Sequence, residues 1–481
     1  MEQVLVGREA EQKVLNKALT SNAPEMVAVV GRRRVGKTFL VRKTYKHQII
    51  FEVTGSQNAP KAEQLANFTN QLNYFAQPII PVKPPADWPT AFQMLIDYLE
   101  AKLGKEKIVV FLDELPWLAT RKSGFLRAFS FFWNSWASQK NVVIVICGSA
   151  ASWMIQKVVR NKGGLHNRIT RRIHLAPFNL SDTELFLQSN GIKMNHYQIL
   201  QIYMTMGGIP HYLKELESGK SAIQNIDDIC FSETGLLQDE FSSLYEALFD
   251  NAAEHIKIIR LLAENRLGLT RQEIIKLGKA SDGGNISKTL EELVSSGFCT
   301  LVFAFGNKKK DRRYILTDEY SLFYLKFIEN KRNEGRGTWT KLSQTQTWKS
   351  WSGFAFENIC FKHVFQIKES LRIGGIYSEA STYRFKGDDT IPDFQIDLLI
   401  DRNDQVINII EIKFYKEDFL MTKAYAAKLR QRMALFKAKT KTKKQLFLTM
   451  LTTFPLIENQ HSLGFVDQAL TMEVLFKSVE V

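Results

Sequence analysis

The sequence contains little cysteine, little proline and no long run of apolar residues. Its four cysteines lie far apart in a chain of 481 residues and form no CxxC pair, which argues against a disulfide framework or a zinc site. No stretch of about 18 apolar residues is present to span a membrane, and the charged start of the chain lacks the apolar core of a signal peptide. These absences predict a cytoplasmic protein without membrane contact.

Positive charge is in excess. The chain has 64 Lys+Arg against 50 Asp+Glu, a formal net charge of +14. Such an excess favours an anionic partner, most often nucleic acid, although a solvated surface with a basic bias has the same composition. The length exceeds what a single hydrophobic core serves, so we expect several domains.

A glycine-rich loop follows the first strongly apolar segment, Met26–Val30. The motif G-x-x-x-x-G-K-T runs from Gly31 to Thr38 and leads into a predicted helix. Gly31 and Gly36 let backbone N–H groups face the phosphates of ATP, Lys37 reaches the β- and γ-phosphates, and Thr38 offers its hydroxyl to Mg²⁺. The other residues of the predicted nucleotide-binding segment are Arg32, Arg33, Arg34, Val35 and Phe39.

Polar residues end two further apolar strands. Asp113 and Glu114 follow Ile108–Leu112, and Ser149 follows "VVIVICG". The carboxyl ends of parallel strands carry the ligand sites of α/β sheets. We expect Asp113 to hold Mg²⁺ through water and Glu114 to polarise the attacking water. By position, Ser149 resembles the polar residue of the sensor strand in AAA+ and STAND ATPases, which contacts the γ-phosphate.

Three arginines, Arg168, Arg171 and Arg172, lie close together after this strand. One of them, with Arg168 preferred, is expected to complete the nucleotide site in the same chain or in a neighbouring subunit. The alternative is that all three face solvent or DNA.

Two short segments resemble the elements that bracket adenine in STAND-like ATPases. The first contains Gly7, Arg8 and Glu9, and the second is "GGIP", which ends at Pro210. Proline has no N–H and a fixed φ, which suits a flat contact with the base. An ordinary helix stop and restart has the same sequence pattern.

The middle of the chain, from His255 to about Thr317, predicts three short helices followed by a hairpin. This is the pattern of a winged helix, with Asn285, Ser287 and Lys288 on the helix expected to face DNA and a basic hairpin tip "NKKKDRR". A spacer or protein-contact module is the alternative. The polar segment that follows predicts a linker.

The last third predicts elements in the order αβββαβ, which is that of the PD-(D/E)XK nuclease core. The first strand is expected to contain Arg372–Tyr377. Strand parity places Glu411 and Lys413 on one face, where Asp397 of the preceding strand and Glu357 of the first helix can join them.

Three carboxylates favour Mg²⁺ or Mn²⁺, with Lys413 positioning the attacking water. The "PD" at Pro392–Asp393 is the alternative source of the aspartate ligand, and Asp397 is preferred. The segment from Phe419 to Ile457 has nine Lys/Arg and no acidic residue, so it can track a phosphate backbone or form a solvated helix face.

These motifs together resemble a prokaryotic ATPase family abundant in archaea and Bacteroidetes. Its members join a STAND/AAA+-like P-loop ATPase to a winged helix and to a C-terminal domain similar to PD-(D/E)XK nucleases. The resemblance implies an α/β P-loop fold with a parallel sheet, a helical lid, a winged helix and a restriction-endonuclease-like domain. The expected boundaries are 1–180 for the ATPase core, 181–250 for the lid, 251–328 for the winged helix, 329–345 for the linker and 346–481 for the nuclease-like domain.

The resemblance implies binding and hydrolysis of Mg-ATP. Our leading hypothesis is an ATPase that controls a DNA-binding, metal-dependent nuclease domain. The alternative is a STAND-type ATP switch or defence sensor whose C-terminal domain is catalytically inactive and binds DNA or protein. A third interpretation, a machine resembling helicase loaders, would require a homo-oligomer and an arginine from a neighbouring subunit.

Overall fold

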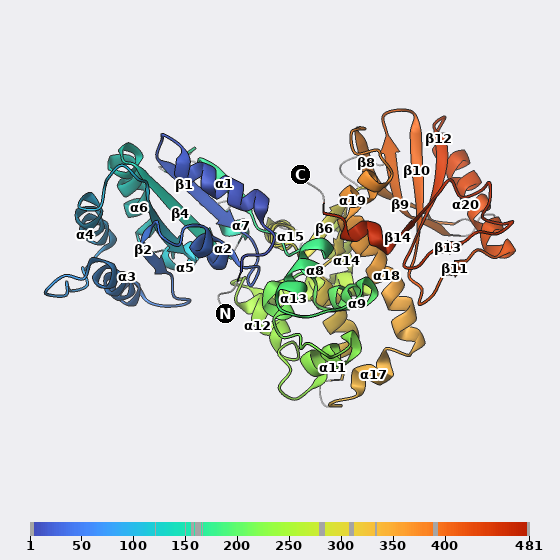
Figure 1. Cartoon of the computed structure of the whole chain (residues 1–481), viewed down its shortest axis with the longest axis horizontal. Coiled ribbons are helices and arrows are strands. Elements are labelled where there is room, and N and C mark those ends of the chain that lie inside the picture. Colours follow the sequence, from blue (N-terminus) through green and yellow to red (C-terminus); the bar gives the residue numbers. More distant parts are fainter. Residues whose placement is uncertain are drawn as a thin grey trace. The chain divides into compact units, whose positions relative to one another are not determined.

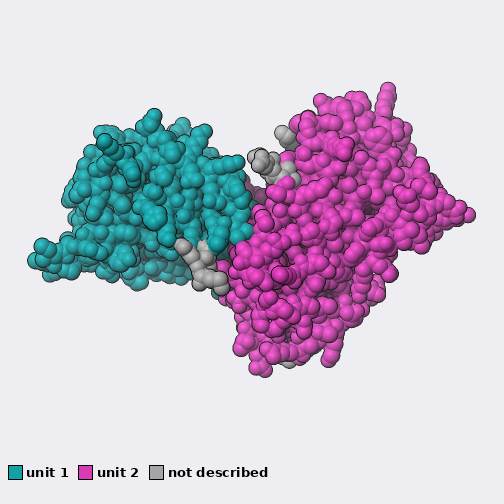
Figure 2. All heavy atoms as spheres, viewed as in Figure 1, with its two compact units in different colours: residues 1–177, 246–250 teal, residues 178–245, 251–481 magenta. Residues whose placement is uncertain are grey.

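The computed structural model of the chain describes residues 4–120, 122–149, 151–154, 158, 165, 167–278, 284–306, 312–331, 334–387 and 393–478. The chain forms two compact units (Figure 2). Unit 1 comprises Met1–Pro177 and Glu246–Asp250, and unit 2 comprises Phe178–Tyr245 and Asn251–Val481. Among the helices of the described residues, none is long and apolar enough to cross a membrane.

Unit 1 is a five-stranded sheet with helices packed against it (Figure 1). Its strands are β1 (Glu25–Val30), β2 (Ile49–Thr54), β3 (Ile108–Asp113), β4 (Val142–Gly148) and β5 (Arg171–His174). Its helices are α1 (Glu9–Thr20), α2 (Lys37–Thr44), α3 (Lys61–Ala76), α4 (Trp88–Glu100), α5 (Leu115–Leu118), α6 (Phe125–Ser135), α7 (Ala151–Met154) and the 3-10 helix η1 (Ala137–Gln139). The strand order is β2-β3-β4-β1-β5, and every pair is parallel.

Strands β1, β3 and β4 are buried along their whole length, as apolar strands at the centre of a parallel sheet should be. The predicted strands Met26–Val30 and Ile108–Leu112 are therefore confirmed. Because β4 lies between β1 and β3, the residue that follows β4 stands between the loop after β1 and the acids at the end of β3.

One face of this sheet packs against an aromatic core supplied by α3, α4 and α6. Phe68, Trp88, Phe92 and Phe125 are at most 2% exposed. The rings of Trp88 and Phe125 meet edge to face with centroids 4.7 Å apart. This dense contact keeps the sheet rigid beneath the loops that carry the predicted nucleotide site.

Unit 2 begins with helices and a small hairpin (Figure 1). The helices are α8 (Leu180–Ser189), α9 (His196–Met206), α10 (Pro210–Leu213), α11 (Ala222–Phe231), α12 (Glu240–Glu246, which reaches into unit 1 by one residue), α13 (Ala252–Glu264), α14 (Arg271–Gly278), α15 (Gly284–Ser295), α16 (Glu319–Phe323), the π-helix η4 (Tyr324–Ile328) and α17 (Thr338–Leu342). Strands β6 (Cys299–Val302) and β7 (Arg313–Leu316) pair antiparallel after α15. The expected order of three helices and a hairpin is present, but residues 307–311 of the predicted basic tip lie outside the described residues.

The C-terminal part of unit 2 contains the second large sheet. Its elements are α18 (Gln346–Lys362), α19 (Val364–Ser370), β8 (Ser378–Phe385), β9 (Phe394–Arg402), β10 (Val406–Lys413), β11 (Phe419–Leu420), α20 (Lys423–Thr440), β12 (Gln445–Thr452), β13 (Leu456–Ile457), β14 (Gln468–Thr471) and the 3-10 helix η5 (Met472–Phe476). The strand order is β14-β12-β10-β9-β8. Strands β8, β9 and β10 pair antiparallel, and β10, β12 and β14 pair parallel. The elements thus follow the predicted order αβββαβ, with β14 added at one edge.

Two features differ from the sequence predictions. The first strand of this sheet begins at Ser378, because Arg372–Tyr377 forms a turn in which Arg372 has a φ of 58°. The segment expected to be a linker contains α17, and Trp339 is 1% exposed there. Asp227 accepts hydrogen bonds from the backbone N–H groups of Gly337 and Trp339, so the segment is fixed to α11.

Candidate functional site

The glycine loop connects β1 to the N-terminus of α2, as predicted (Figure 1). Gly36 has a φ of 91°, a conformation that residues with a Cβ rarely adopt. A Cβ on Gly31 would lie 2.3 Å from the carbonyl oxygen of Leu175, so only glycine allows this close backbone approach. In the rest of the loop, Arg32 and Val35 are buried, and Arg33, Arg34 and the following Phe39 are partly exposed.

The structure brings together the residues expected to hold phosphate and Mg²⁺. Lys37 is 5% exposed, and its ammonium donates to the carbonyl oxygen of Arg32 at 2.9 Å, inside the loop. Thr38 donates its hydroxyl to Asp113 Oδ2 at 2.7 Å. Residues 75 positions apart in the chain thus meet at the edge of the sheet where β1 and β3 end.

Glu114 and Ser149 are also brought together. Glu114 Oε2 accepts hydrogen bonds from the backbone N–H of Ser149 at 3.0 Å and from its hydroxyl at 2.8 Å. Glu114 has a φ of 46°, an uncommon backbone conformation for a residue with a side chain, which is often found at functional sites. The structure therefore assigns Ser149 a contact that the sequence did not predict, namely to the carboxylate of Glu114.

The remaining predicted residues of unit 1 have different environments. Arg8 is 8% exposed and donates to the carbonyl oxygen of Ala176 at 2.7 Å, so it fixes the segment next to Leu175 that lies against Gly31. Gly7 precedes it with a φ of 64°. Arg171 pairs with Glu25 at 2.7 Å, which accounts for it as a structural residue of β5. Arg168 is exposed, and its role in a nucleotide site stays a prediction.

Comparison with known proteins gives the same assignment for this part of the chain. Residues 5–216 match an ATPase domain found predominantly in Archaea. The chain thus carries a P-loop ATPase domain, and the match extends beyond unit 1 through "GGIP".

Relatives along more of the chain are distant. The chain is 24% identical over 425 residues to an uncharacterized protein of Methanocaldococcus jannaschii, covering 85% of this chain and 88% of that protein. Among solved structures, the Walker-type ATPase of Pyrococcus abyssi gives a TM-score of 0.49 at 16% identity, covering 67% of this chain and 96% of that chain. The ORC2 protein of Aeropyrum pernix gives a TM-score of 0.40 at 16% identity, covering 72% of this chain and 98% of that chain.

The "GGIP" glycines serve close packing within unit 2. A Cβ on Gly208 would lie 2.0 Å from the carbonyl oxygen of Phe178, and one on Gly207 would lie 2.9 Å from Glu319 Oε2. Pro210 is the first residue of α10. Its expected contact with adenine stays a prediction.

The four residues predicted for the C-terminal site form one electrostatic cluster in unit 2. Glu411 is 2% exposed, and its Oε1 lies 2.9 Å from Lys413 Nζ. Asp397 Oδ2 accepts from the backbone N–H of Ile412 at 3.1 Å. Burial, with the charge of Asp397 second, raises the pKa of Glu357 above its ordinary value. Helix α18 packs against β10, and Glu357 on this helix is close enough for the charges of Asp397 and Glu411 to act on it.

Acidic side chains are concentrated in this cluster, and burial disfavours their charged forms. Burial, and then the charge of Glu411, raises the pKa of Asp397. Burial disfavours the ammonium of Lys413, but the carboxylates of Glu411 and Asp397 outweigh it and raise its pKa. The lysine is therefore charged and balances part of the charge of the acids.

The carboxylates are not arranged as expected for a metal ion. Among the described residues, no three His, Cys, Asp or Glu side chains lie together as a group that could hold one. The physical reason is competition, because Glu411 Oε1 contacts Lys413, Tyr425 and Arg432. The convergence of Glu357, Asp397 and Glu411 on a single ion is thus not seen in this structure. Asp393, the alternative aspartate ligand, is exposed and accepts a hydrogen bond from the backbone N–H of Gly387 at 2.6 Å, and Pro392 lies outside the described residues.

Two residues of the cluster were not predicted. Tyr425 donates its hydroxyl to Glu411 Oε1 at 2.5 Å, and Arg432 Nη1 lies 3.5 Å from the same oxygen. Both are on α20 and are seven positions apart, so they share one helix face. Helical periodicity in "AYAAKLRQR" indicates this shared face, but not that it lies against Glu411.

On helix α15, Asn285, Ser287 and Lys288 are exposed, as expected for residues that could face DNA. The hydroxyl of Ser287 accepts a hydrogen bond from Arg271 at 2.8 Å. Lys288 lies 3.6 Å from Glu292. These contacts hold two of the three side chains in place on the protein surface.

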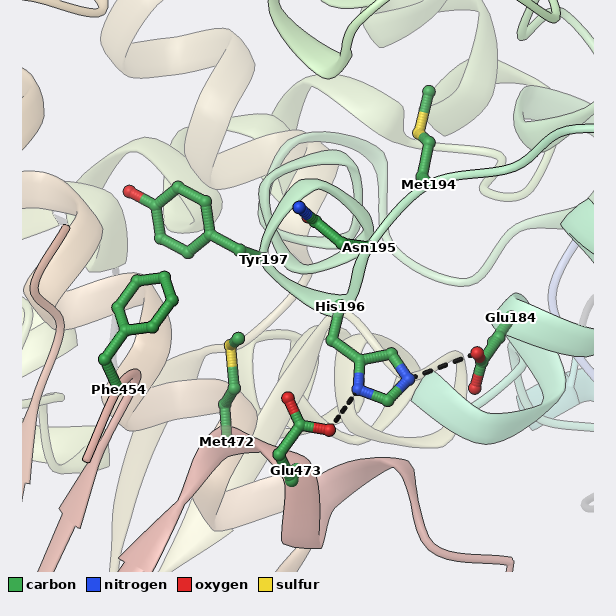
Figure 3. Close-up of a pocket in the computed structure, with 8 residues that line it drawn as sticks. All are labelled: Glu184, Met194, Asn195, His196, Tyr197, Phe454, Met472 and Glu473. Atoms are coloured by element: carbon green, nitrogen blue, oxygen red, sulfur yellow. Dashed lines mark hydrogen bonds and ion pairs between the residues drawn. The ribbon is translucent and has the colours of Figure 1, made fainter. Parts of the chain in front are cut away.

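A cavity of about 380 Å³ in unit 2 contains none of the predicted site residues (Figure 3). It is lined by Glu184, Met194, Asn195, His196, Tyr197, Phe454, Met472 and Glu473. Figure 3 shows the imidazole of His196 between Glu184 and Glu473, and Nε2 lies 3.1 Å from Glu184 Oε1. These contacts join α8 and α9 to η5, which helps to explain why the helical segment and the C-terminal sheet belong to one unit.

Proposed function

We propose that this protein hydrolyses Mg-ATP in unit 1 and contacts nucleic acid through unit 2. The observation that carries the first part is the pair of contacts Thr38–Asp113 and Ser149–Glu114 beside the glycine loop. A nucleotide-binding domain without hydrolytic activity would need the first contact but not a positioned second carboxylate.

The residues present fit Mg²⁺. A threonine hydroxyl and a carboxylate, 2.7 Å apart at the start of a helix, are the oxygen donors that this ion prefers. When bound with ATP, Mg²⁺ neutralises charge on the phosphates. Thr38 and Asp113 would hold the ion. The ammonium of Lys37 would exchange its hydrogen bond to the carbonyl oxygen of Arg32 for contacts with the phosphates.

Glu114 is proposed to polarise the attacking water, and its position supports this role. The two hydrogen bonds from Ser149 fix one carboxylate oxygen and leave Glu114 Oε1 to accept a proton from water. Pre-organisation of this kind reduces the reorganisation needed at the moment of reaction. Arg168 is proposed to complete the site, from the same chain or from a neighbouring subunit of a homo-oligomer.

The test of the first part is phosphate release from ATP by the purified chain, with and without Mg²⁺, alongside Lys37→Ala. We expect hydrolysis that requires Mg²⁺ and that is lost in Lys37→Ala. Equal turnover by the variant would contradict the assignment of the glycine loop. Lys46→Ala, an exposed lysine just beyond α2, is the matched control for loss of a positive charge.

The proposed nucleic-acid contact is supported by α20 and the loop after it. Six exposed lysines lie in this segment, which has no acidic residue: Lys423, Lys428, Lys437, Lys439, Lys441 and Lys443. The same helix supplies Tyr425 and Arg432 to the acidic cluster. A phosphate backbone on these lysines would therefore pass close to Lys413. DNA is the expected partner because its phosphates give dense negative charge.

A second candidate function is cleavage of a phosphodiester bond at the C-terminal cluster. The electrostatic cluster of Asp397, Glu411 and Lys413 with Glu357 favours it. Among the described residues, the carboxylates of this cluster are not grouped as ligands for a metal ion. Incubation of supercoiled and linear DNA with Mg²⁺ or Mn²⁺, with and without ATP, tests it. Cleavage that disappears in Lys413→Ala supports this function, whereas binding without cleavage supports the alternative of an ATP-dependent switch.

A further inference from the structure

Arg266 lies on a tight turn between α13 and α14. The N–H of Gly268 donates to the carbonyl oxygen of Asn265 at 2.8 Å and closes the turn. Gly268 has a φ of +72°, and a Cβ there would lie 2.7 Å from the carbonyl oxygen of Tyr314 on β7. The backbone that carries Arg266 is therefore held firmly against the hairpin.

The side chain of Arg266 extends to helix α18 of the C-terminal part. Its guanidinium carbon lies 5.2 Å from the ring centroid of Phe354, and Nη1 lies 3.5 Å from the carbonyl oxygen of Ser350. Ser350, Phe354 and Glu357 are spaced by four and three positions, so they share one face of α18. Arg266 thus lies beside the acidic cluster, although it is about 90 positions away from Glu357 along the chain.

The charge of Arg266 acts on Glu357 electrostatically, but Arg266 forms no ion pair with a described residue. Arg266 favours the charged form of Glu357 and so opposes the rise in its pKa. Among the described residues, however, no carboxylate is recorded within 4 Å of its guanidinium nitrogens. With one long hydrogen bond, the guanidinium keeps most of its five N–H donors for another acceptor.

We propose that Arg266 binds a phosphate of the nucleic-acid backbone next to the cluster of Glu357, Asp397, Glu411 and Lys413. The planar guanidinium matches two oxygens of a phosphate, and its contact with the Phe354 ring keeps it beside the cluster. This inference rests on the proposed contact between unit 2 and nucleic acid, and it identifies a residue outside the C-terminal segment that takes part.

The competing explanation is that Arg266 only offsets the charge of Glu357. The two explanations differ in how binding depends on salt. Each phosphate contact that is lost lowers the slope of log K against log salt by about 0.9 for duplex DNA. A residue that only balances charge within the protein leaves this slope unchanged.

The experiment measures binding of a short linear DNA duplex to the full chain over a range of salt concentrations, without divalent cation so that no cleavage occurs. The variants are Arg266→Gln, which keeps a polar side chain, and Arg266→Ala. The matched control is Arg260→Gln on α13, because Arg260 is paired with Glu329 at 2.8 Å. Thermal unfolding of each variant shows that the fold is intact.

We expect both Arg266 variants to bind more weakly with a slope smaller by about 0.9, and Arg260→Gln to keep the wild-type slope. A wild-type slope in a folded Arg266→Gln variant, even with weaker binding, would overturn the inference and leave the proposed nucleic-acid contact in place. Failure of the wild-type chain to bind the duplex in a salt-dependent way would overturn both.

Discussion

Ser149 holds the carboxylate of Glu114 through two hydrogen bonds to the same oxygen, from its backbone N–H at 3.0 Å and its hydroxyl at 2.8 Å. The backbone bond is independent of the side chain, whereas the hydroxyl bond is not. Because β4 lies between β1 and β3, this pair stands at the edge of the sheet next to Thr38 and Asp113. The arrangement makes Ser149 a positioning residue for the proposed general base.

Ser149→Ala should lower ATP turnover while leaving nucleotide affinity unchanged. A hydrogen bond to a charged group contributes about 1.5–3 kcal/mol, which corresponds to a loss of roughly 10- to 100-fold if it is needed only in the reaction. Ser149→Thr keeps the hydroxyl and is the matched control. Steady-state kinetics together with a nucleotide-binding titration check this. Equal turnover by Ser149→Ala and the wild type would contradict a positioning role.

Thr38→Ala should raise the Mg²⁺ concentration needed for half-maximal ATP hydrolysis, because one oxygen donor for the ion is lost. Thr38→Ser retains the donor and should behave like the wild type. Titration of Mg²⁺ at saturating ATP measures the difference. Identical Mg²⁺ curves for all three chains would show that the contact between Thr38 and Asp113 serves stability alone.

We predict that protonation of the buried His363 lowers the stability of the fold at acidic pH. It is 2% exposed, Nδ1 lies 2.8 Å from the carbonyl oxygen of Ile359, and Nε2 lies 3.2 Å from the N–H of Leu180. A neutral ring with its proton on Nδ1 satisfies both contacts. Burial lowers the pKa of His363 from 6.5 to about 4. The contribution of the neutral ring to the free energy of unfolding is therefore complete above pH 6.5. It is lost as the pH falls through 4, and at pH 4 the loss is about 3 kcal/mol.

This loss is measured from urea unfolding at pH 7 and pH 4.5 for the wild type and His363→Gln. We expect the variant to be the less stable at pH 7 and the gap between the two chains to shrink markedly at pH 4.5. His174→Gln, an exposed histidine in unit 1, is the control. A gap that is the same at both pH values would contradict the account.

Asp397→Asn should stabilise unit 2 at alkaline pH. The raised pKa of Asp397 means that the folded chain holds its proton more tightly than the unfolded chain, so ionisation becomes more costly for the folded state as pH rises. Removing the charge should gain at least about 1.4 kcal/mol at pH 8.5, the equivalent of one pKa unit, and little at pH 4. Asp404→Asn is the control with the opposite sign, because Arg402 holds the pKa of Asp404 low. Thermal unfolding midpoints of the wild type and the variant at the two pH values measure the effect. A midpoint for Asp397→Asn below that of the wild type at pH 8.5 would contradict this prediction.

The glycine loop and the residues after β3 and β4 could be predicted because each depends on local sequence. An apolar strand of six or seven residues that ends in a polar residue fixes which edge of a parallel sheet that residue occupies. The contact between Ser149 and Glu114 could not be predicted, because it depends on the order of strands in the sheet. The charges at Glu411 and Lys413 likewise follow from strand parity, but the hydroxyl of Tyr425 reaches Glu411 only through the packing of α20.

The segment around Trp339 shows why the expected linker was wrong. Its sequence is polar and contains glycine, which is typical of a linker. Asp227, more than one hundred positions earlier, accepts from the N–H of Trp339 at 2.7 Å, and the Trp339 ring stacks on Phe231 with centroids 6.0 Å apart. Contacts of such long range leave no local pattern. The same holds for Arg266 and Phe354.

The most direct test of the account is a comparison of ATP binding and ATP hydrolysis by the wild type and Glu114→Gln. The glutamine has nearly the same shape but cannot accept a proton from water. We predict that the variant binds ATP with Mg²⁺ as tightly as the wild type and hydrolyses it at least about 100-fold more slowly. Hydrolysis at the wild-type rate by Glu114→Gln would contradict the central claim.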